Sequence, residues 1–328
     1  MKTVKTMLII LLSGFTLSLQ AQKIGLVLDS FVSDRWYLDQ KLITEKIKEL
    51  GGECLVEVAN GDPVEQVNIS KKLIQQGVKV LIVIAVDAIK SAEIVSLAKA
   101  ANVHVISYDR LIMSKDIALY ISYNNTKVGE LQAQYMLDRF PTGKYVLLNG
   151  PVSDNNAVQL KSGQLKVLQP HIDKGKIKVV GDFVLSDWGE IGALMKMDDF
   201  FSSSTEKPDV IMAANDALAD GSIQSLPADL VKKVAITGQD ADLNAIRNII
   251  AGKQSMTIYK PIKPLAYMAA ELALKLAKGG DVSGKTKFQS GGITVDAIFL
   301  DPIVVNKSNY NDTVVKDGHV KESELVVH

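Results

Sequence analysis

Short apolar runs alternate with amphipathic stretches of helical period along the first half of the chain. The expected strands cover residues 24–28, 54–58, 80–84 and 103–107, and the expected helices cover residues 38–50, 64–76 and 88–100. The run 80–84 is continuously apolar, which is typical of a parallel strand buried on both faces. Strands that alternate with helices in this way predict an open parallel sheet with helices on both faces.

The same pattern begins again in the second half of the chain. Strand-like runs recur at residues 144–148, 177–180, 210–213 and 234–237. The string VKVLIVIAVDA in the first half matches PDVIMAANDA in the second, and VHVISYDR matches VAITGQDAD. An internal duplication of this kind predicts two similar Rossmann-like α/β lobes, each built on a parallel sheet.

Three further segments indicate where the chain crosses between the lobes. They cover residues 120–124, 256–260 and 300–303. Each lobe is then discontinuous: residues 23–122 with 260–300 form the N-terminal lobe, and residues 123–259 with 301–328 form the C-terminal lobe. A ligand cleft is expected between them, because open α/β sheets bind ligands beyond the carboxyl ends of their strands.

The composition is that of a globular protein without a nucleic-acid partner. Of 328 residues, 47% are hydrophobic and 23% are charged. Lysine plus arginine and aspartate plus glutamate each number 37, so the formal net charge is zero. Nucleic-acid binding normally requires a basic surface. Cys54 is the one cysteine, which excludes an internal disulfide.

The first residues have the layout of a secretory signal peptide. Lys2 and Lys5 precede an apolar run over residues 7–17, and a small residue, Ala21, follows at the expected cleavage site. The apolar run is shorter than the roughly 20 residues that span a bilayer. We therefore expect residues 1–21 to direct export and to be removed, with an uncleaved anchor as the alternative.

Polar and aromatic side chains collect after the carboxyl ends of the expected strands. They are Arg35 and Trp36 after the first, Asp109 and Arg110 after the fourth, Asn155 and Asn156 after 144–148, Trp188 after 177–180, Asn215 after 210–213, and Asp240 after 234–237. Planar Arg, Asp and Asn groups suit adjacent sugar hydroxyls, and a tryptophan plane suits the apolar face of a sugar ring. At any single position a local role, such as capping the next helix, is an equal alternative.

The sequence lacks the motifs that are typical of metal sites and serine hydrolases, and its P-loop-like string lies in the wrong context. The four histidines form no spaced pair, and no Gly-x-Ser-x-Gly motif occurs. Residues 279–286 match the P-loop pattern, but the expected helix 266–278 precedes them, whereas a P-loop follows a strand and opens a helix. Asp109 and Asp240 could suggest a glycosidase or a calcium site. Arginines beside two of the post-strand clusters favour ligand hydrogen bonding, so no enzyme activity, cofactor or metal is expected.

Several longer strings resemble one family. DRW, YDR, DNNA, AANDA, GQDADL, IRNIIAGKQSMTIYKPI and DTVVKDGHVKESEL are similar to the D-xylose-binding periplasmic proteins of bacterial ABC importers. The resemblance runs from about residue 23 to residue 325. It implies the type I periplasmic binding protein fold, with two lobes and a hinge of three crossings.

Carried over by matching motif, the resemblance implies ten sugar contacts. They are Arg35, Trp36, Asp109, Arg110, Asn155, Asn156, Trp188, Asn215, Asp240 and Lys260. The chain departs from its relatives at residues 85–87, where they carry Pro-Tyr-Asn, and at Gly189 and Glu190. These departures concern the edge of the site and the preference between pentoses.

The resemblance implies a periplasmic, monomeric carrier that captures a monosaccharide, D-xylose, and delivers it to an ABC permease. Lobe closure would bring the sugar into contact with both lobes, and its hydroxyls would satisfy the buried charges. Two alternatives stay open: a sensory subunit that signals to a membrane histidine kinase, and binding of another aldose such as ribose. A sugar-responsive repressor would carry an N-terminal helix-turn-helix, and here the signal peptide stands in its place.

Overall fold

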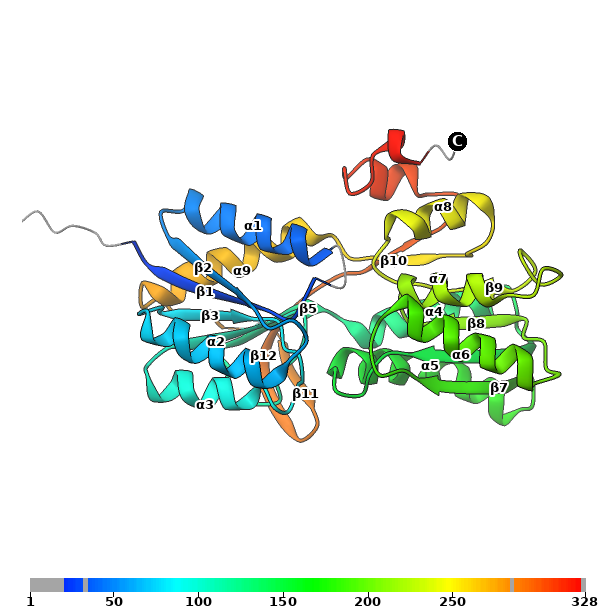
Figure 1. Ribbon diagram of the computed structural model, residues 1–328, viewed down its shortest axis with the longest axis horizontal. Coiled ribbons are helices and arrows are strands. Elements are labelled where there is room, and N and C mark those ends of the chain that lie inside the picture. The colour runs from blue at the N-terminus through cyan, green and yellow to red at the C-terminus, as the bar shows by residue number, and fades with distance from the viewer. Residues whose placement is uncertain (1–20, 32–34, 284–285, 326–328) are drawn as a thin grey trace, which may run out of the picture.

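The computed structural model describes residues 21–31, 35–283 and 286–325, which form two α/β lobes side by side (Figure 1). The expected signal peptide, except for Ala21, lies outside the described residues. Among the described residues, no helix combines the length and the apolar character needed to cross a membrane.

The first lobe is built on a sheet of seven strands. These are β1 (Lys23–Leu28), β2 (Glu53–Val58), β3 (Val80–Val83), β4 (His104–Tyr108), β5 (Leu119–Tyr123), β11 (Thr286–Ser290) and β12 (Ile293–Leu300). Their order is β11-β12-β5-β4-β3-β1-β2, and every neighbouring pair is parallel except β11 with β12.

Four helices cover the two faces of this sheet. They are α1 (Arg35–Glu49), α2 (Pro63–Gln75), α3 (Ala92–Ala100) and α9 (Ile262–Ala277). In β3 successive side chains point to opposite faces. Ile82 joins the core under α1 and α9 with Ile43 and Leu265, whereas Leu81 joins the core under α2 and α3 with Leu73. The strand is buried on both sides, as its continuously apolar sequence predicts.

The second lobe repeats this plan on a smaller parallel sheet, in the order β7-β6-β8-β9. Its strands are β6 (Gly143–Asn149), β7 (Ile177–Val184), β8 (Val210–Ala213) and β9 (Ala235–Ile236). Its helices are α4 (Asn125–Leu137), α5 (Asn155–Asp173), α6 (Glu190–Ser203), α7 (Asp216–Ser225) and α8 (Leu243–Ala251). Helices α4 and α5 touch backbone to backbone, since a Cβ at Gly129 would lie 2.0 Å from the Leu160 carbonyl oxygen.

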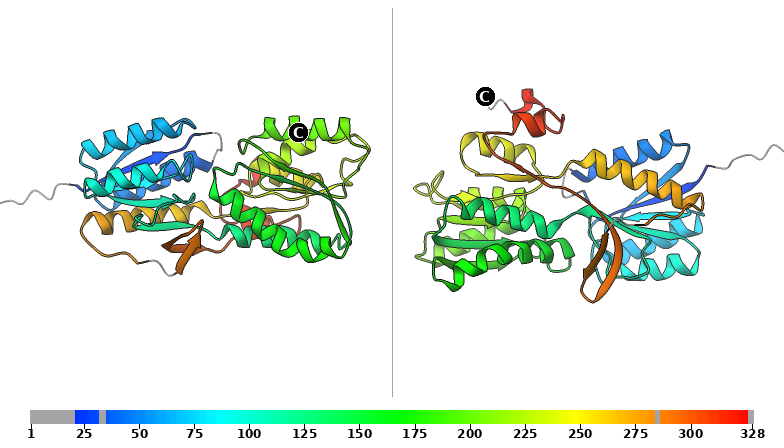
Figure 2. Two further views of the ribbon diagram at one scale, coloured as in Figure 1. Left: turned by 90° about the horizontal axis from the view of Figure 1, so that it is seen from below. Right: turned by 180° about the vertical axis from the view of Figure 1, so that it is seen from behind.

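The chain passes between the two sheets three times, and the right-hand view of Figure 2 shows the extended segments that join the lobes. It crosses from β5 to α4, from β10 (Thr257–Tyr259) to α9, and from β12 to β13 (Ile303–Val305). Strands β10 and β13 pair antiparallel beside each other. The expected fold, two similar α/β lobes joined by three crossings, is confirmed.

Two helix starts differ from the expectation. Helix α1 begins at Arg35 rather than residue 38, so Arg35 lies in its first turn and its Nε approaches the Asp39 carboxylate at 3.3 Å. Helix α3 begins at Ala92 rather than residue 88, because the Asp87 carboxylate accepts hydrogen bonds from the amides of Ile89 and Lys90 and forms a separate turn.

The hairpin of β11 and β12 was not expected. Its two-residue turn, Gly291-Gly292, has positive φ at both positions, as the tightest β-hairpins require. A Gly-Gly pair followed by a β-branched run is the signal that identifies it. The described part of the P-loop-like string, residues 279–283, is an irregular segment after α9, as its position predicted.

Candidate functional site

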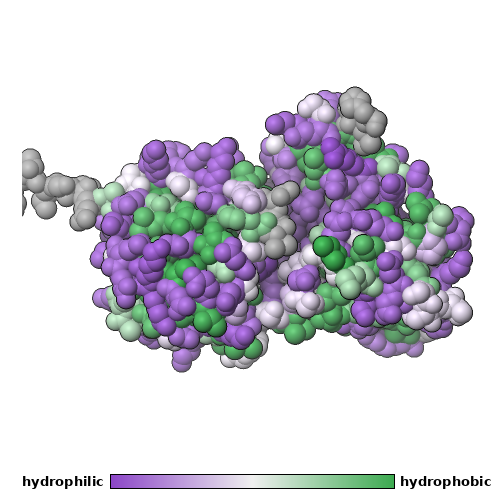
Figure 3. Space-filling view, in the orientation of Figure 1, coloured by the Kyte–Doolittle hydropathy of each residue, from purple (hydrophilic) through white to green (hydrophobic). Residues whose placement is uncertain are grey.

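A cavity of about 550 Å³ lies between the lobes and takes its walls from both. On the face shown in Figure 3, the molecule is hollowed between the lobes, and mostly hydrophilic residues border the hollow. Trp36 and Arg110 line the cavity from the first lobe, and Trp188 and Asn215 line it from the second. We call these four residues the cavity wall.

Arg110 connects the two lobes at the base of the cavity. Its guanidinium donates to the Asp29 carboxylate at 2.7 Å and to the Ala85 carbonyl at 3.2 Å, both at the carboxyl ends of first-lobe strands. From the second lobe, the Asp154 carboxylate lies 2.9 Å from its Nε. Arg110 also stands 5.6 Å from the centre of the Trp36 ring, within the range of a cation–π contact.

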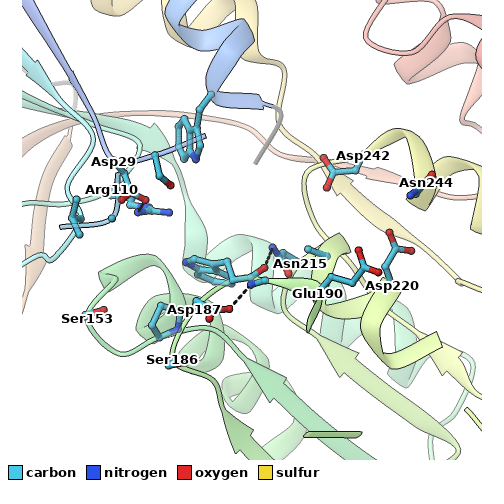
Figure 4. A pocket seen from close by; sticks show the side chains of 18 of the residues that line it. Asp29, Arg110, Ser153, Ser186, Asp187, Glu190, Asn215, Asp220, Asp242 and Asn244 are labelled. Carbon is cyan, nitrogen blue, oxygen red and sulfur yellow. Dashed lines mark hydrogen bonds and ion pairs between the residues drawn. The ribbon is translucent and has the colours of Figure 1, made fainter. Parts of the chain in front are cut away.

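The second-lobe side of the wall is fixed by its own hydrogen bonds. The Trp188 indole N–H donates to Asp154 at 3.0 Å. The ring packs on Gly150, where an added Cβ would come within 2.6 Å of it. The Asn215 side chain accepts from the Leu218 amide at 2.9 Å and so caps α7, while its amide nitrogen lies 3.4 Å from the Trp188 carbonyl. Figure 4 shows Asp29 and Arg110 facing Ser153, Asp187 and Asn215 across the cavity.

Beside the wall lies a charged network made of Arg35, Asp39, Asp109, Asp240 and Lys260. Arg35 donates to Asp109 at 3.0 Å, to Asp39 at 3.3 Å and to Asp240 at 3.4 Å. The Lys260 ammonium lies 2.9 Å from Asp240. Because Asp240 follows β9 of the second lobe, the network also joins the lobes. Among the described residues, no group of three or more His, Cys, Asp or Glu side chains is arranged to hold a metal ion.

The charges of the network shift one another's pKa values. Burial alone would raise the pKa of Asp109, but Arg35, Lys260 and Arg110 together lower it below its ordinary value. Burial likewise opposes the charge on Arg35, yet the three surrounding aspartates raise its pKa well above the usual range. Asp109 and Arg35 are therefore both charged at neutral pH.

Asp39 behaves differently from Asp109. Burial raises its pKa to about 6, and the opposing influences of Arg35 and of the hydrogen bond from the Tyr108 hydroxyl only partly offset this effect. Its side chain is fully buried in α1. Burial thus raises the pKa of Asp39, whereas the neighbouring cations lower that of Asp109.

The two neighbouring asparagines at the start of α5 point to different partners. The Asn156 amide donates to Asp109 at 3.1 Å, and its oxygen accepts from Asn125 at 3.0 Å. The Asn155 oxygen accepts from Ser290 of the β11–β12 hairpin at 3.0 Å. The Asn155 amide nitrogen is buried, and no described residue accepts a hydrogen bond from it.

The ten residues expected at the site therefore fall into two groups. Four form the cavity wall, while six lie beside it with protein partners: Arg35, Asp109, Asn155, Asn156, Asp240 and Lys260. The resemblance implies that sugar hydroxyls satisfy the buried charges. In the structure protein groups of opposite charge already do so.

Sequence reasoning did not select Asp29 and Asp154, the two carboxylates that hold Arg110. Each had a detectable signal: Asp29 directly follows the first strand, and Asp154 occupies the N-cap of α5, where it accepts from the Asn156 amide at 2.9 Å. Burial raises the pKa of Asp154 despite the opposing effects of Arg110 and of the hydrogen bonds that it accepts.

Comparison with known proteins shows which sequences and structures the chain is similar to. The family model described as "periplasmic binding protein domain" matches residues 24–281. The chain is 43% identical to the D-xylose-binding periplasmic protein of Escherichia coli over 96% of both chains. It is also 43% identical to the protein of the same name in Haemophilus influenzae, over 92% of this chain and 91% of that one.

A solved structure shows the same architecture. An ABC transporter solute-binding protein from Clostridium phytofermentans, with bound β-D-glucose, matches 93% of this chain and 100% of its own with a TM-score of 0.86 and 25% identity.

Proposed function

Because the chain belongs to the periplasmic binding protein family, we propose that it captures D-xylose between its lobes and delivers it to the membrane subunits of an ABC importer. The observation that carries this proposal is the cavity of about 550 Å³ whose walls come from both lobes. D-xylose is named because both curated relatives at 43% identity are D-xylose-binding proteins.

The chemistry of the cavity wall suits a neutral sugar. Trp36 and Trp188 offer aromatic surface to the apolar face of the ring, and Arg110 and Asn215 offer donors to its hydroxyls. The six expected contacts beside the wall present their polar groups to the sugar when the lobes close.

Closure is the step that couples binding to transport. We propose that residues 23–122 with 260–300 move as one body against residues 123–259 with 301–328. The sugar contacts both bodies only in the closed form, and this difference in affinity shifts the equilibrium toward closure. An epimer that misplaces one hydroxyl leaves a buried polar group unpaired, which accounts for selectivity.

The remaining parts of the proposal follow from the same family. The protein acts in the periplasm as a monomer, after removal of residues 1–21, and catalyses no reaction on the sugar. The periplasmic relatives support the compartment. A turnover assay on aryl xylosides tests the absence of catalysis, and any sugar release above background contradicts it.

The decisive experiment is a tryptophan-fluorescence titration of the chain from Gln22 onward. The sugars are D-xylose first, then ribose, arabinose, glucose and galactose. Both tryptophans line the cavity, so D-xylose should change the emission in a saturable way. The expected dissociation constant is micromolar, about −8 kcal/mol of binding free energy.

Single-tryptophan variants locate the signal. Trp36 is 4% exposed, while Trp188 is only partly buried, so Trp188→Phe should remove more of the signal than Trp36→Phe. Saturation by another sugar and not by D-xylose would contradict the proposed ligand and leave the proposed capture of a sugar standing. No response to any sugar, confirmed by calorimetry, would contradict sugar binding itself.

A further inference from the structure

The loop that carries Asp240 has an unusual backbone. Asp240 has φ +99° and Ala241 has φ +59°, two successive non-glycine residues in the left-handed region. Such a conformation is strained for a residue with a side chain and persists only where its surroundings hold it. The conformation directs the Asp240 carboxylate toward Arg35 and Lys260, so whatever holds this loop also fixes that carboxylate.

Three backbone amides of the loop are held from one side. The Asp240 amide donates to a β10 carbonyl at 2.8 Å, the Ala241 amide to Thr257 Oγ1 at 3.2 Å, and the Asp242 amide to the Asp216 carboxylate at 3.0 Å. The Thr257 hydroxyl also donates to Asp216, at 2.9 Å. Strand β10 and Asp216 thus satisfy the donors of the loop and leave the Ala241 carbonyl to another partner.

That partner comes from the end of the chain. His319 Nε2 lies 3.0 Å from the carbonyl oxygen of Ala241, a residue with no exposed surface. A carbonyl oxygen only accepts hydrogen bonds, so the proton of the imidazole must be on Nε2. Burial is the main influence on the His319 side chain and lowers its pKa, which leaves the ring neutral at neutral pH.

His319 belongs to a C-terminal cap, residues 306–325, which packs against α8 and the loop. In Figure 1 this segment lies directly above α8. Val314 and Val320 of the cap share a buried cluster with Ala241 and Ile246. The cap is thus anchored on the hydrophobic side of the loop that carries Asp240.

Polar contacts fix the orientation of the cap as well. The His319 ring lies 4.8 Å from the ring of Tyr259, whose hydroxyl donates to Asp317. Arg247 of α8 donates twice to the Glu324 carbonyl, at 2.7 and 3.0 Å. Because Asp317 and Glu324, which flank His319 in the sequence, are both held by hydrogen bonds, the cap keeps the imidazole in place against the Ala241 carbonyl.

We infer that His319 is a positioning residue for sugar binding, which holds the Ala241 carbonyl and so keeps the neighbouring Asp240 carboxylate in place between the lobes. His319 is not among the residues that line the cavity, and it contacts the loop at the Ala241 carbonyl. The inference rests on the proposed function, because Asp240 is one of the proposed sugar contacts.

Three variants test the role of the hydrogen bond. His319→Leu keeps most of the side-chain volume and removes the donor, so we expect D-xylose affinity to fall about tenfold. His319→Gln places an amide donor near the position of Nε2, so it should bind within about threefold of the parent. His104→Leu, at an exposed position on β4, is the matched control and should bind as the parent does. Affinities are measured by calorimetry.

A second measurement does not depend on the ligand. Amide hydrogen exchange at Ala241 and Asp242 in the sugar-free protein should accelerate in His319→Leu and stay close to the parent in His319→Gln and His104→Leu. If His319→Leu does not fold, His319→Asn replaces it, since its amide is too short to reach the same carbonyl.

The outcomes distinguish a positioning role of the His319 hydrogen bond from a purely structural role of its ring. Parent-like affinity and exchange in His319→Leu would overturn the inference and leave the proposed function standing. An equal loss in His319→Gln and His319→Leu would show that ring packing matters and the hydrogen bond does not, which also overturns it. If the parent bound no sugar, the proposed function would fail, and the exchange data would still decide whether His319 fixes the loop.

Discussion

The cavity wall and the charged network lie side by side between the lobes, yet their side chains differ in how completely the protein already pairs them. In the wall, Trp36 and Trp188 line the cavity with their rings, and the Asn215 amide nitrogen has a long contact, 3.4 Å, with the Trp188 carbonyl. The guanidinium of Arg110, by contrast, is held by the carboxylates of Asp29 and Asp154. In the network, both cations lie within 3.4 Å of a carboxylate. A ligand therefore adds contacts to the wall, but it must share or exchange contacts in the network.

This difference predicts two classes of variant. Changes in the wall should weaken sugar binding and alter stability only where a residue also has a local structural task. Changes in the network should lower stability and binding together, because removal of one partner leaves a buried charge uncompensated. The network also joins Arg35 of the first lobe to Asp240 of the second, so its loss should affect lobe closure.

The largest effect is expected from Asp240→Ala, which leaves Arg35 and Lys260 without their shared partner. Loss of one member of a buried pair costs about 3 kcal/mol or more, so the unfolding free energy should fall by about that amount. D-xylose affinity should fall at least a hundredfold. Denaturant unfolding measures the first quantity, and calorimetry measures the second.

The control for this variant is Asp229→Ala, which removes an exposed pair with Lys207 at 2.8 Å. Exposed pairs contribute little, so its Tm and its affinity should match the parent's. If Asp240→Ala also matched the parent in both measurements, the network would have no role in either property.

The next effect concerns pH, through Asp39. Its pKa is about 6 in the folded protein, against an ordinary value of 3.8. The folded state binds the proton more tightly, so this group contributes stability below about pH 4 that is lost as the pH rises through 6. The loss between pH 4 and pH 7 amounts to at most about 3 kcal/mol.

Asp39→Asn removes the titrating group and should flatten that part of the stability profile. Denaturant unfolding of the parent and the variant at pH 4, 5, 6 and 7 gives the comparison. Identical slopes in both proteins would mean that Asp39 is ionised throughout this range and that Arg35 outweighs its burial.

A smaller effect separates the two tasks of Asn215 in the wall. Asn215→Ala removes the cap of α7, which should cost about 1 kcal/mol of stability, and it also removes a donor to the sugar. Asn215→Asp keeps the cap and replaces the donor, which lies 3.4 Å from the Trp188 carbonyl, with a charged oxygen. Both variants should bind D-xylose about tenfold more weakly, while Asn215→Asp should keep the parent's Tm. If the Tm of Asn215→Asp were as low as that of Asn215→Ala, the capping and sugar-binding roles of Asn215 would not be separable in this way.

The sequence predicts the elements well because their signals are local. The continuously apolar run at residues 80–84 and the Gly residues that end helices act through neighbouring positions, and the structure follows them. The duplicated strings likewise predict two lobes, because similar sequences form similar units. The expected helix begins at residue 38 and not at Arg35, because the apolar pattern gives no sign of the contact between Arg35 and Asp39 in the first turn of α1.

The site is predictable only in part, because its pairings join distant residues. The strand-end rule brings Trp36, Arg110, Trp188 and Asn215 to one cavity, as the structure shows. No local sequence pattern indicates that Arg110 pairs with Asp29 and Asp154, which lie on opposite lobes. The role of His319 is still harder to anticipate, since it lies 78 positions from the carbonyl that it holds.

The smallest effect is expected at the edge of the cavity, at Glu190, where the chain departs from its relatives. Glu190 opens α6 and accepts a hydrogen bond from Gln224, which Gln at position 190 can also accept. Glu190→Gln should therefore change D-xylose affinity by less than about threefold. The variant should have a clearer effect on Asp220, whose pKa is raised to about 6 by burial and then by the negative charge of Glu190. Removal of that charge should lower the pKa of Asp220, which carboxyl NMR titration can follow. An unchanged pKa would assign the whole shift to burial, and a tenfold change in pentose preference would show that Glu190, which lines the cavity, helps to select the sugar.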